Sequence, residues 1–152
     1  KSSAASDVYK RQSNITTILV THDINDALNI SDKILIFKDG ISQQFSSPET
    51  MYCEPANCYC AETLGDVNKF PIDDKIYYIR PENLNIVNHS EYSINVQKCF
   101  FQGKEYKITG KFKDNEWLLY SKKPLKVNSE VFFNYSESDL IYFKDSNPKC
   151  FS

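Results

Sequence analysis

The first part of the chain contains a short apolar run, followed by apolar residues at helical spacing. Thr16–Val20 is a short β-branched apolar run, which predicts a strand buried on both faces of a parallel sheet. A stripe of apolar residues at helical spacing begins at Ile24, and Thr21 or Asp23 can accept the free N–H groups at its start. We therefore expect a strand, a polar corner and a helix, in that order.

A hairpin and two short helices are predicted next. Asp39 and Gly40 follow the apolar run Lys33–Phe37, and an Asp-Gly pair between apolar segments is a strong signal for a two-residue hairpin turn. Ser47 can cap a helix whose first residue is a proline, and Asn57 can cap another helix that ends near residue 64. These elements extend the α/β pattern to about residue 65.

From residue 75 the hydrophobic period changes to two, which is typical of β-strands. The polar stretch 66–74 contains Pro71, and we interpret it as a linker between two domains. Turn-forming residues separate the alternating stretches beyond the linker, which predicts a small barrel or sandwich instead of βαβ units. About seven short strands are expected, around Tyr77 and Ile79, Leu84 and Ile86, Ile94 and Val96, Tyr106 and Ile108, Trp117 and Leu119, Val131 with Phe133 and Tyr135, and Ile141 and Phe143.

The two ends of the chain show neither period. Residues 1–12 are polar and aperiodic, so we expect a disordered tail there, and we interpret residues 146–152 as a second tail. The predicted order is a tail (1–12), an α/β part (13–65), a linker (66–74), an all-β domain (75–145) and a tail (146–152).

Composition narrows the classes of function. The chain has 152 residues and a formal net charge of -2, which argues against a surface that neutralises nucleic-acid phosphates. Its apolar runs are far shorter than the roughly 20 residues of a membrane-spanning helix. The sequence also shows no charged-then-apolar leader, so we expect a cytoplasmic protein. Cys53, Cys58 and Cys60 lie close together, but their spacing fits no zinc motif and predicts no metal site.

His22 is the candidate catalytic residue. A lone histidine after an apolar run is more often solvated or hydrogen-bonded within the structure than catalytic. Ligands of open α/β sheets, however, bind beyond the carboxyl ends of the strands, and His22 follows the predicted strand at such an end. Its imidazole can donate a hydrogen bond to a phosphate oxygen there.

Four short motifs support a more specific interpretation. THD (21–23), SDKI (31–34), DG (39–40) and SPE (47–49) follow one another within Thr16–Gly65. In this order and at this spacing, the stretch resembles the ABC ATPases, specifically the polyamine, iron(III), sulfate and maltose importer group. By this resemblance His22 matches the switch histidine, whose ring contacts the γ-phosphate of ATP, so it is assigned both a catalytic and a cofactor-binding role. Phosphoryl transfer depends mostly on positioning and charge stabilisation, which one donor at the γ-phosphate fits.

A second resemblance covers Ile76–Lys144. Its most recognisable element is Arg80-Pro81-Glu82, and the stretch resembles the transport-associated OB (TOBE) domain that follows the ATPase domain in these importers. Arg80 and Glu82 form either a local ion pair or turn between two strands, or part of a ligand sensor. The fold class implied is an α/β remnant of a P-loop ABC ATPase domain followed by a small all-β OB-like barrel.

The resemblance also implies cofactors and partners for the intact protein. ATP and magnesium would be its cofactors, and membrane-spanning permease subunits and a second ATPase subunit its partners, with no nucleic acid. The protein would lie in the cytoplasm, peripheral to the inner face of the plasma membrane. The resemblance does not determine the transported solute, for which iron(III), polyamine, sulfate and sugar all stay open.

This sequence departs from the family's ATPase pattern. It contains no GxxxxGK[ST] phosphate loop, no LSGGQ-type signature and no apolar run that ends in Asp-Glu. We therefore expect a C-terminal fragment that alone neither binds ATP tightly nor hydrolyses it. Two other classes stay open: an OB-like module that binds a small ligand or single-stranded nucleic acid through exposed aromatic residues, and an adaptor whose helices between residues 47 and 64 dock a partner.

Overall fold

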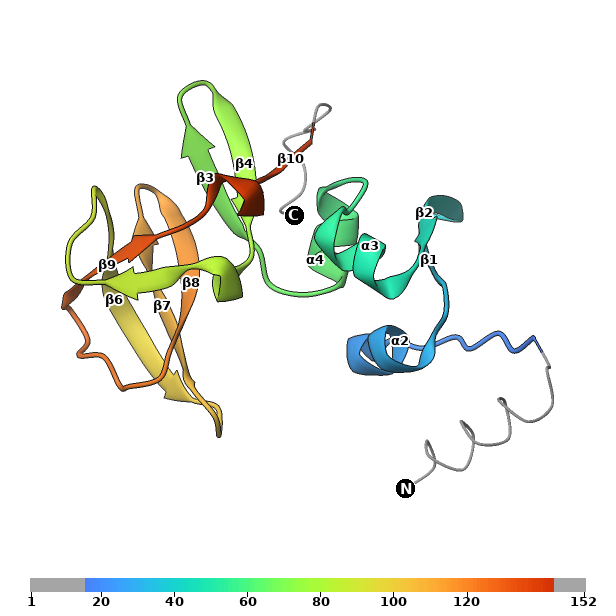
Figure 1. The fold of residues 1–152 in the computed structure, drawn as a ribbon, viewed down its shortest axis with the longest axis horizontal. Coiled ribbons are helices and arrows are strands. Elements are labelled where there is room, and N and C mark those ends of the chain that lie inside the picture. The colour runs from blue at the N-terminus through green and yellow to red at the C-terminus, as the bar shows by residue number, and fades with distance from the viewer. Residues whose placement is uncertain (1–15, 144–152) are drawn as a thin grey trace. The chain divides into compact units, whose positions relative to one another are not determined.

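The computed structural model describes residues 16–143, and both predicted tails lie outside the described residues. These residues divide into two compact units, 16–56 and 57–143, which are taken in turn below. The first unit contains one hairpin and two short helices: α2 (Ile24–Ile30), β1 (Ile34–Lys38), β2 (Ile41–Ser46) and α3 (Pro48–Cys53) (Figure 1).

Local signals account for the elements of the first unit. The Asp23 carboxylate caps α2 by accepting a hydrogen bond from the N–H of Asn25 at 2.8 Å. Asp39 and Gly40, with φ angles of 51° and 77°, form the turn between β1 and β2, which confirms the predicted hairpin. The predicted cap of α3 at Ser47 is also confirmed.

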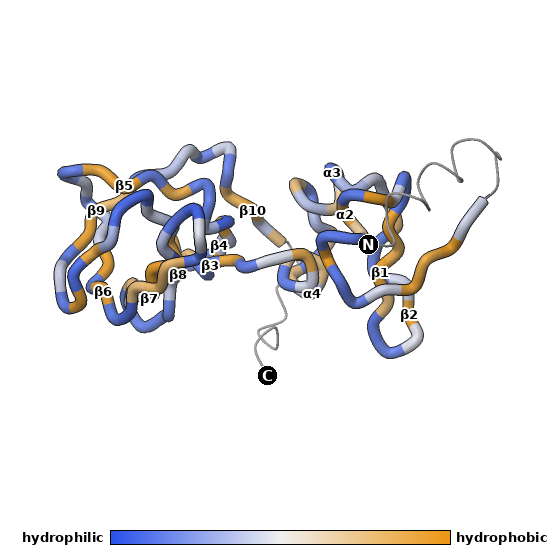
Figure 2. Tube along the Cα trace, turned by 90° about the horizontal axis from the view of Figure 1, so that it is seen from below, coloured by the Kyte–Doolittle hydropathy of each residue, from blue (hydrophilic) through white to orange (hydrophobic). Residues whose placement is uncertain are grey.

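Thr16–Val20 does not form the strand that its apolar run predicts. These residues have no regular secondary structure, and Ile18 and Val20 are 88% and 93% exposed. A strand inside a parallel sheet is held by neighbours on both edges, and the described part of this unit offers only the antiparallel β1–β2 hairpin. The apolar residues ahead of α2 stand out as an orange stretch in Figure 2. The assignment to a P-loop ATPase domain therefore stays a prediction.

The second unit is mostly β-structure. Its strands form a three-stranded sheet in the order β10-β4-β3 and a five-stranded sheet in the order β5-β9-β6-β7-β8, both antiparallel. The five-stranded sheet curls into a half-barrel, consistent with an OB-like domain. The elements are α4 (Cys58–Thr63), β3 (Asn68–Ile72), β4 (Lys75–Ile79), the 3-10 turn η1 (Pro81–Asn83), β5 (Asn85–Val87), β6 (Tyr92–Phe101), β7 (Tyr106–Phe112), β8 (Asn115–Ser121), β9 (Glu130–Asn134), the 3-10 turn η2 (Glu137–Asp139) and β10 (Ile141–Tyr142).

Each of the seven predicted alternating stretches lies in or directly beside a strand, but β3 was not predicted. It occupies the middle of the stretch 66–74, which the sequence indicates as a linker. Pro71 favours a linker in the sequence. Proline is nevertheless tolerated in an edge strand, and β3 is at the edge of its sheet. Phe70 of β3 is fully buried in the core of the second unit. The domain boundaries as such stay a prediction.

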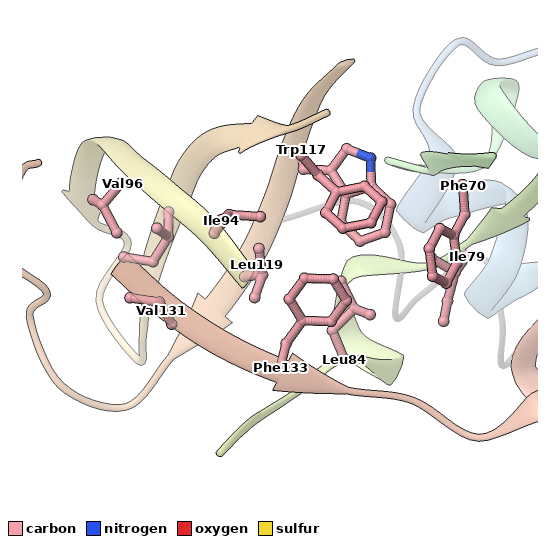
Figure 3. Close-up of a cluster of buried hydrophobic side chains, with 11 residues drawn as sticks. Phe70, Ile79, Leu84, Ile94, Val96, Trp117, Leu119, Val131 and Phe133 are labelled. Atoms are coloured by element: carbon pink, nitrogen blue, oxygen red, sulfur yellow. The ribbon is translucent and has the colours of Figure 1, made fainter. Parts of the chain in front are cut away.

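Aromatic residues dominate the core of the second unit. Trp117 of β8 and Phe133 of β9 are fully buried, with ring centroids 5.1 Å apart. Phe70 of β3 meets the Trp117 ring edge-on at the same distance, 5.1 Å. Figure 3 shows Trp117 and Phe133 near the strands of the half-barrel and Phe70 beside Ile79 of β4. The two sheets thus share one hydrophobic core, which stabilises both.

Side chains join β3 to the open edge of β8. The Asn68 amide donates to the carbonyl of Leu118 and accepts from its N–H, both at 2.8 Å. The Trp117 indole N–H donates to the carbonyl of Lys69 at 2.9 Å. Asn68 is 1% exposed, so its amide supplies buried pairing that a further strand would otherwise provide.

Candidate functional site

His22 lies in the short corner that precedes α2. Thr21 Oγ1 accepts a hydrogen bond from the N–H of Asp23 at 2.9 Å, and Asp23 in turn caps the helix. The corner is therefore ordered by the two neighbours of His22, and the predicted capping role of Asp23 is confirmed. His22 itself is exposed, and within residues 16–143 its ring has no hydrogen-bond partner.

From this corner the exposed ring of His22 can donate a hydrogen bond to an anion. A phosphate group usually needs several donors, and His22 is the residue that the sequence predicts for such a role. No group of three His, Cys, Asp or Glu side chains that could hold a metal ion occurs in the part of the chain that the structure describes. The catalytic and cofactor-binding roles of His22 stay predictions.

The first unit exposes several large apolar side chains. Leu35 and Phe37 of β1 and Phe45 of β2 are 44%, 57% and 65% exposed, whereas Ile34 and Ile36 on the alternate positions of β1 are buried. Leu35 faces Phe45 across the hairpin, so the exposed residues lie on one face. An apolar face of this kind indicates an interaction surface.

Arg80 has a structural position that the sequence did not indicate. It follows β4 directly, is 3% exposed, and its Nη1 donates to the carbonyls of Ala61, Gly65 and Asp66 at 2.9, 3.1 and 3.3 Å. These carbonyls belong to the last turn of α4 and the segment after it. Arg80 thus fixes the end of α4 to the end of β4.

The Arg80-Pro81-Glu82 motif also lies in a turn between two strands, as predicted. Pro81–Asn83 forms η1, closed by a hydrogen bond from the N–H of Leu84 to the carbonyl of Pro81 at 3.2 Å. The interpretation of the motif as a turn between two strands is therefore confirmed. No local pattern could have revealed the partner at Ala61, because it lies 19 residues away.

An ion pair extends this connection to the half-barrel. Lys107 Nζ of β7 donates to the Asp66 carboxylate at 2.6 Å. This hydrogen bond raises the pKa of Lys107 above its ordinary value. The segment between α4 and β3 is thus held from two sides, by Arg80 at its backbone and by Lys107 at the side chain of Asp66.

The clustered cysteines pack in different ways. Cys58 and Cys60 are buried in α4, as expected of small apolar residues, while Cys53 at the end of α3 is exposed. Burial raises the pKa of the Cys60 thiol, with the neighbouring Asn57 backbone opposing this effect.

No helix in residues 16–143 combines the length and the apolar character that crossing a bilayer requires.

Sequence comparisons identify relatives over nearly the whole chain. No family model matches it. A spermidine/putrescine import ATP-binding protein, PotA, of Clostridium novyi is 31% identical over 162 residues, which cover 89% of this chain and 47% of that protein. Proteins of the same name from Acetivibrio thermocellus and Borreliella afzelii are 27% and 30% identical, over 89% and 86% of this chain and 46% of each protein.

The chain spans about half the length of the curated relatives it matches. The matched part includes both units, so the likeness is not confined to the half-barrel or to the segment that contains His22. The resemblance stated from the short motifs is confirmed: the chain is homologous to the ATP-binding subunits of ABC importers.

Proposed function

We propose that this chain is the C-terminal part of the ATP-binding subunit of an ABC importer, and that the intact protein couples ATP hydrolysis to the uptake of a polyamine. The single observation that carries this proposal is the identity of 27–31% to spermidine/putrescine import ATP-binding proteins over 86–89% of the chain. The curled five-stranded sheet supports it, because the resemblance to TOBE domains predicts such a sheet.

The exposed apolar residues of the first unit also support the proposal. Ile18, Val20 and the hairpin face at Phe37 and Phe45 are residues that an ATPase domain would cover with further strands. In the intact protein we expect Thr16–Val20 to join a parallel sheet, which brings His22 to the carboxyl edge of that sheet.

ATP and magnesium are the cofactors proposed for the intact protein. His22 fits one role toward ATP, since an exposed imidazole can donate a hydrogen bond to the γ-phosphate. The described residues contain no cluster of carboxylate and imidazole groups for a metal ion. Binding of magnesium and the nucleotide is assigned to the remainder of the subunit because this sequence has no phosphate-loop or LSGGQ-type motif, so this chain alone should neither bind ATP tightly nor hydrolyse it.

The proposed partners follow from the same assignment. They are membrane-spanning permease subunits and a second ATP-binding subunit, at the cytoplasmic face of the membrane. Nucleic acid is not among the proposed partners, because the chain has nearly balanced charges. The alternative of a free-standing OB-like module is not favoured, because the import proteins match this chain over both of its units.

The test is a chimeric importer subunit. Residues 16–152 replace the matching half of the Clostridium novyi protein, and the chimera is assembled with its permease. We expect His22→Ala to lower solute-stimulated ATP hydrolysis by roughly a hundredfold, the cost of one donor that acts mainly in the transition state. ATP affinity should change little, because the lost contact contributes less to the ground state.

His89→Ala is the matched control, since His89 is exposed and lies in the other unit. It should leave hydrolysis within about twofold of the unchanged chimera. If the His22→Ala chimera hydrolyses ATP at a normal rate, His22 has no catalytic role. If the unchanged chimera folds but neither binds its permease nor hydrolyses ATP, the assignment of the chain to an importer subunit fails.

A further inference from the structure

His22 stands between two side chains that bond to the backbone around it. Thr21 Oγ1 accepts a hydrogen bond from the N–H of Asp23 at 2.9 Å, so the Thr21 side chain bridges the residues on either side of His22. One oxygen of the Asp23 carboxylate accepts from the N–H groups of Asn25 and Asp26 at 2.8 and 3.3 Å. The corner is thus closed by its own side chains on both sides of the histidine.

These contacts fix the backbone from which the imidazole projects. The N–H of Asp23 belongs to the peptide group that joins it to His22, so its bond to Thr21 restrains the His22 backbone directly. Asp23 is also joined to α2, because its carbonyl accepts the first helical bond from the N–H of Ala27 at 3.1 Å. Within residues 16–143 the ring has no hydrogen-bond partner, so its direction depends on this backbone and on the staggered rotamers open to the side chain.

The start of α2 is occupied by the Asp23 carboxylate. The N–H groups of Asn25 and Asp26, which a helix leaves unpaired at this end, already have this partner. The exposed imidazole of His22, in contrast, is available to an anion. No residue of α2 is fully buried, so no core side chain of the helix holds the corner in place. The contacts of Thr21 and Asp23 therefore decide where His22 stands.

We propose that Thr21 and Asp23 are positioning residues for His22: the Thr21 hydroxyl and the Asp23 carboxylate together direct the imidazole toward the γ-phosphate of ATP. The inference rests on the proposed function, which assigns His22 to that phosphate. A catalytic group acts fully only near its productive geometry, and a displacement of about 1 Å can cost roughly a hundredfold in rate. Neither positioning side chain has to contact ATP, because each acts through the position of His22.

The first experiment examines the 152-residue chain itself, without nucleotide. Backbone order parameters of His22 and Asp23 are measured by nuclear magnetic resonance relaxation. We expect both N–H groups to be rigid in the unchanged chain, with values near about 0.85. Thr21→Val keeps the branched shape of threonine but has no hydroxyl, and should lower these values toward the flexible range below about 0.6. Thr21→Ser keeps the acceptor and should stay rigid, and His89, in the other unit, should not change in either variant.

The second experiment measures ATP hydrolysis in the chimeric importer subunit. Thr21→Val should lower kcat roughly tenfold, less than the loss in His22→Ala, because the imidazole remains but is misplaced. ATP affinity should stay within about twofold, since the imidazole contact acts mainly in the transition state. Thr21→Ser should keep kcat within about threefold of the unchanged chimera, because its hydroxyl supplies the same acceptor.

Variants of Asp23 separate capping from charge. Asparagine and aspartate cap helices about equally well, so Asp23→Asn should keep kcat within about threefold, whereas Asp23→Ala should lower it roughly tenfold. Asp26→Asn is the matched control, because it removes a negative charge from the same turn while the side-chain contacts of Thr21 and Asp23 remain. It should change kcat by less than about twofold.

A double variant tests whether the positioning residues act through the histidine. In a His22→Ala background, Thr21→Val should have no further effect, because the group that it positions is gone. A further loss of about tenfold in that background would overturn the proposal. So would a Thr21→Val chain that stays rigid or a chimera with this change that keeps normal turnover, and so would Asp23→Asn as slow as Asp23→Ala. Normal hydrolysis with His22→Ala would instead refute the catalytic role of His22 itself, so the two failures can be told apart.

Discussion

The guanidinium of Arg80 lies against the end of α4, where its Nη1 donates to the carbonyl oxygen of Ala61 at 2.9 Å. The last carbonyls of a helix have no partner within the helix, and a positive charge is favourable at this end. The last turn of α4 contains no basic residue. Arg80, the residue directly after β4, therefore supplies the cap that the sequence of the helix lacks.

Replacing this arginine should destabilise the second unit strongly. In Arg80→Met the carbonyls of Ala61, Gly65 and Asp66 lose a buried charged donor, which costs about 2–4 kcal/mol in free energy of unfolding. Urea unfolding followed by Trp117 fluorescence measures this loss. Lys111→Met, at an exposed position of β7, should cost less than about 0.5 kcal/mol. Equal losses in the two variants would show that capping by Arg80 does not stabilise the fold.

Replacing Asn68 by aspartate, which removes the amide N–H donor, should destabilise the second unit. Asn68→Asp can still accept from the N–H of Leu118, but its ionised carboxylate faces the Leu118 carbonyl without a hydrogen to share. We expect a loss of about 2–3 kcal/mol at pH 7 in urea unfolding. Burial raises the folded-state pKa of the introduced carboxyl above its unfolded value, so stability is retained at low pH and lost as pH rises through the folded pKa.

The comparison of Asn68→Asp with Asn68→Ala isolates that pH effect. The alanine variant lacks a titrating group at this position, so its deficit relative to the unchanged chain should be the same at pH 4 and pH 7, within about 0.5 kcal/mol. A deficit of Asn68→Asp that does not shrink toward low pH would contradict the assigned contact with the Leu118 carbonyl.

The ion pair of Lys107 and Asp66 should contribute modestly and only below high pH. The hydrogen bond to Asp66 raises the folded-state pKa of Lys107, so its stabilisation is complete below the unfolded pKa of about 10.4 and is lost as pH rises through the folded pKa. The two side chains are 26% and 41% exposed. Lys107→Met should therefore cost less than about 1 kcal/mol at pH 7 in urea unfolding.

Lys122→Met is the matched control for the ion pair. Lys122 contacts Glu105 at 3.3 Å, but its side chain is 81% exposed, so its loss should have almost no effect. The difference between Lys107→Met and the unchanged chain should disappear near pH 12. A difference that grows with pH in this range would have the wrong sign for the assigned pair.

Amide hydrogen exchange should separate the two units. Ile18–Val20 has no regular hydrogen-bonded structure and should exchange as fast as an unfolded peptide. Ile94 and Ile108, on interior strands of the five-stranded sheet, should exchange last. Strong protection at Ile18–Val20 in the isolated chain would contradict the view that this run needs strands from elsewhere.

Short-range signals predicted much of this fold. Asp23, Ser47 and Asn57 act as helix caps, because a cap depends on contacts within three residues. The alternation of apolar residues also predicted the strands of the half-barrel, since burial on one face imposes a period of two. Gly40 completed the predicted hairpin for a similarly local reason.

Contacts distant in sequence could not be predicted in the same way. The bond from Arg80 to Ala61 and the pairing of Asn68 with Leu118 link residues 19 and 50 positions apart, and no local period encodes them. The strand predicted at Thr16–Val20 is absent for the opposite reason. The local pattern favours a strand, but a strand forms only where neighbouring strands provide hydrogen bonds. The candidate site at His22 depends on the same neighbours.

The joint between β3 and β8 divides the second unit along a seam. No main-chain ladder crosses it in the described residues, and Asn68 and Trp117 connect the strands by their side chains. The three-stranded and five-stranded sheets can therefore separate while every backbone ladder stays intact. Such a local opening would expose the buried ring of Phe70 to water before the second unit unfolds. Trp117, the sole tryptophan of the chain, stands on this seam and would register each opening as a change in its own emission.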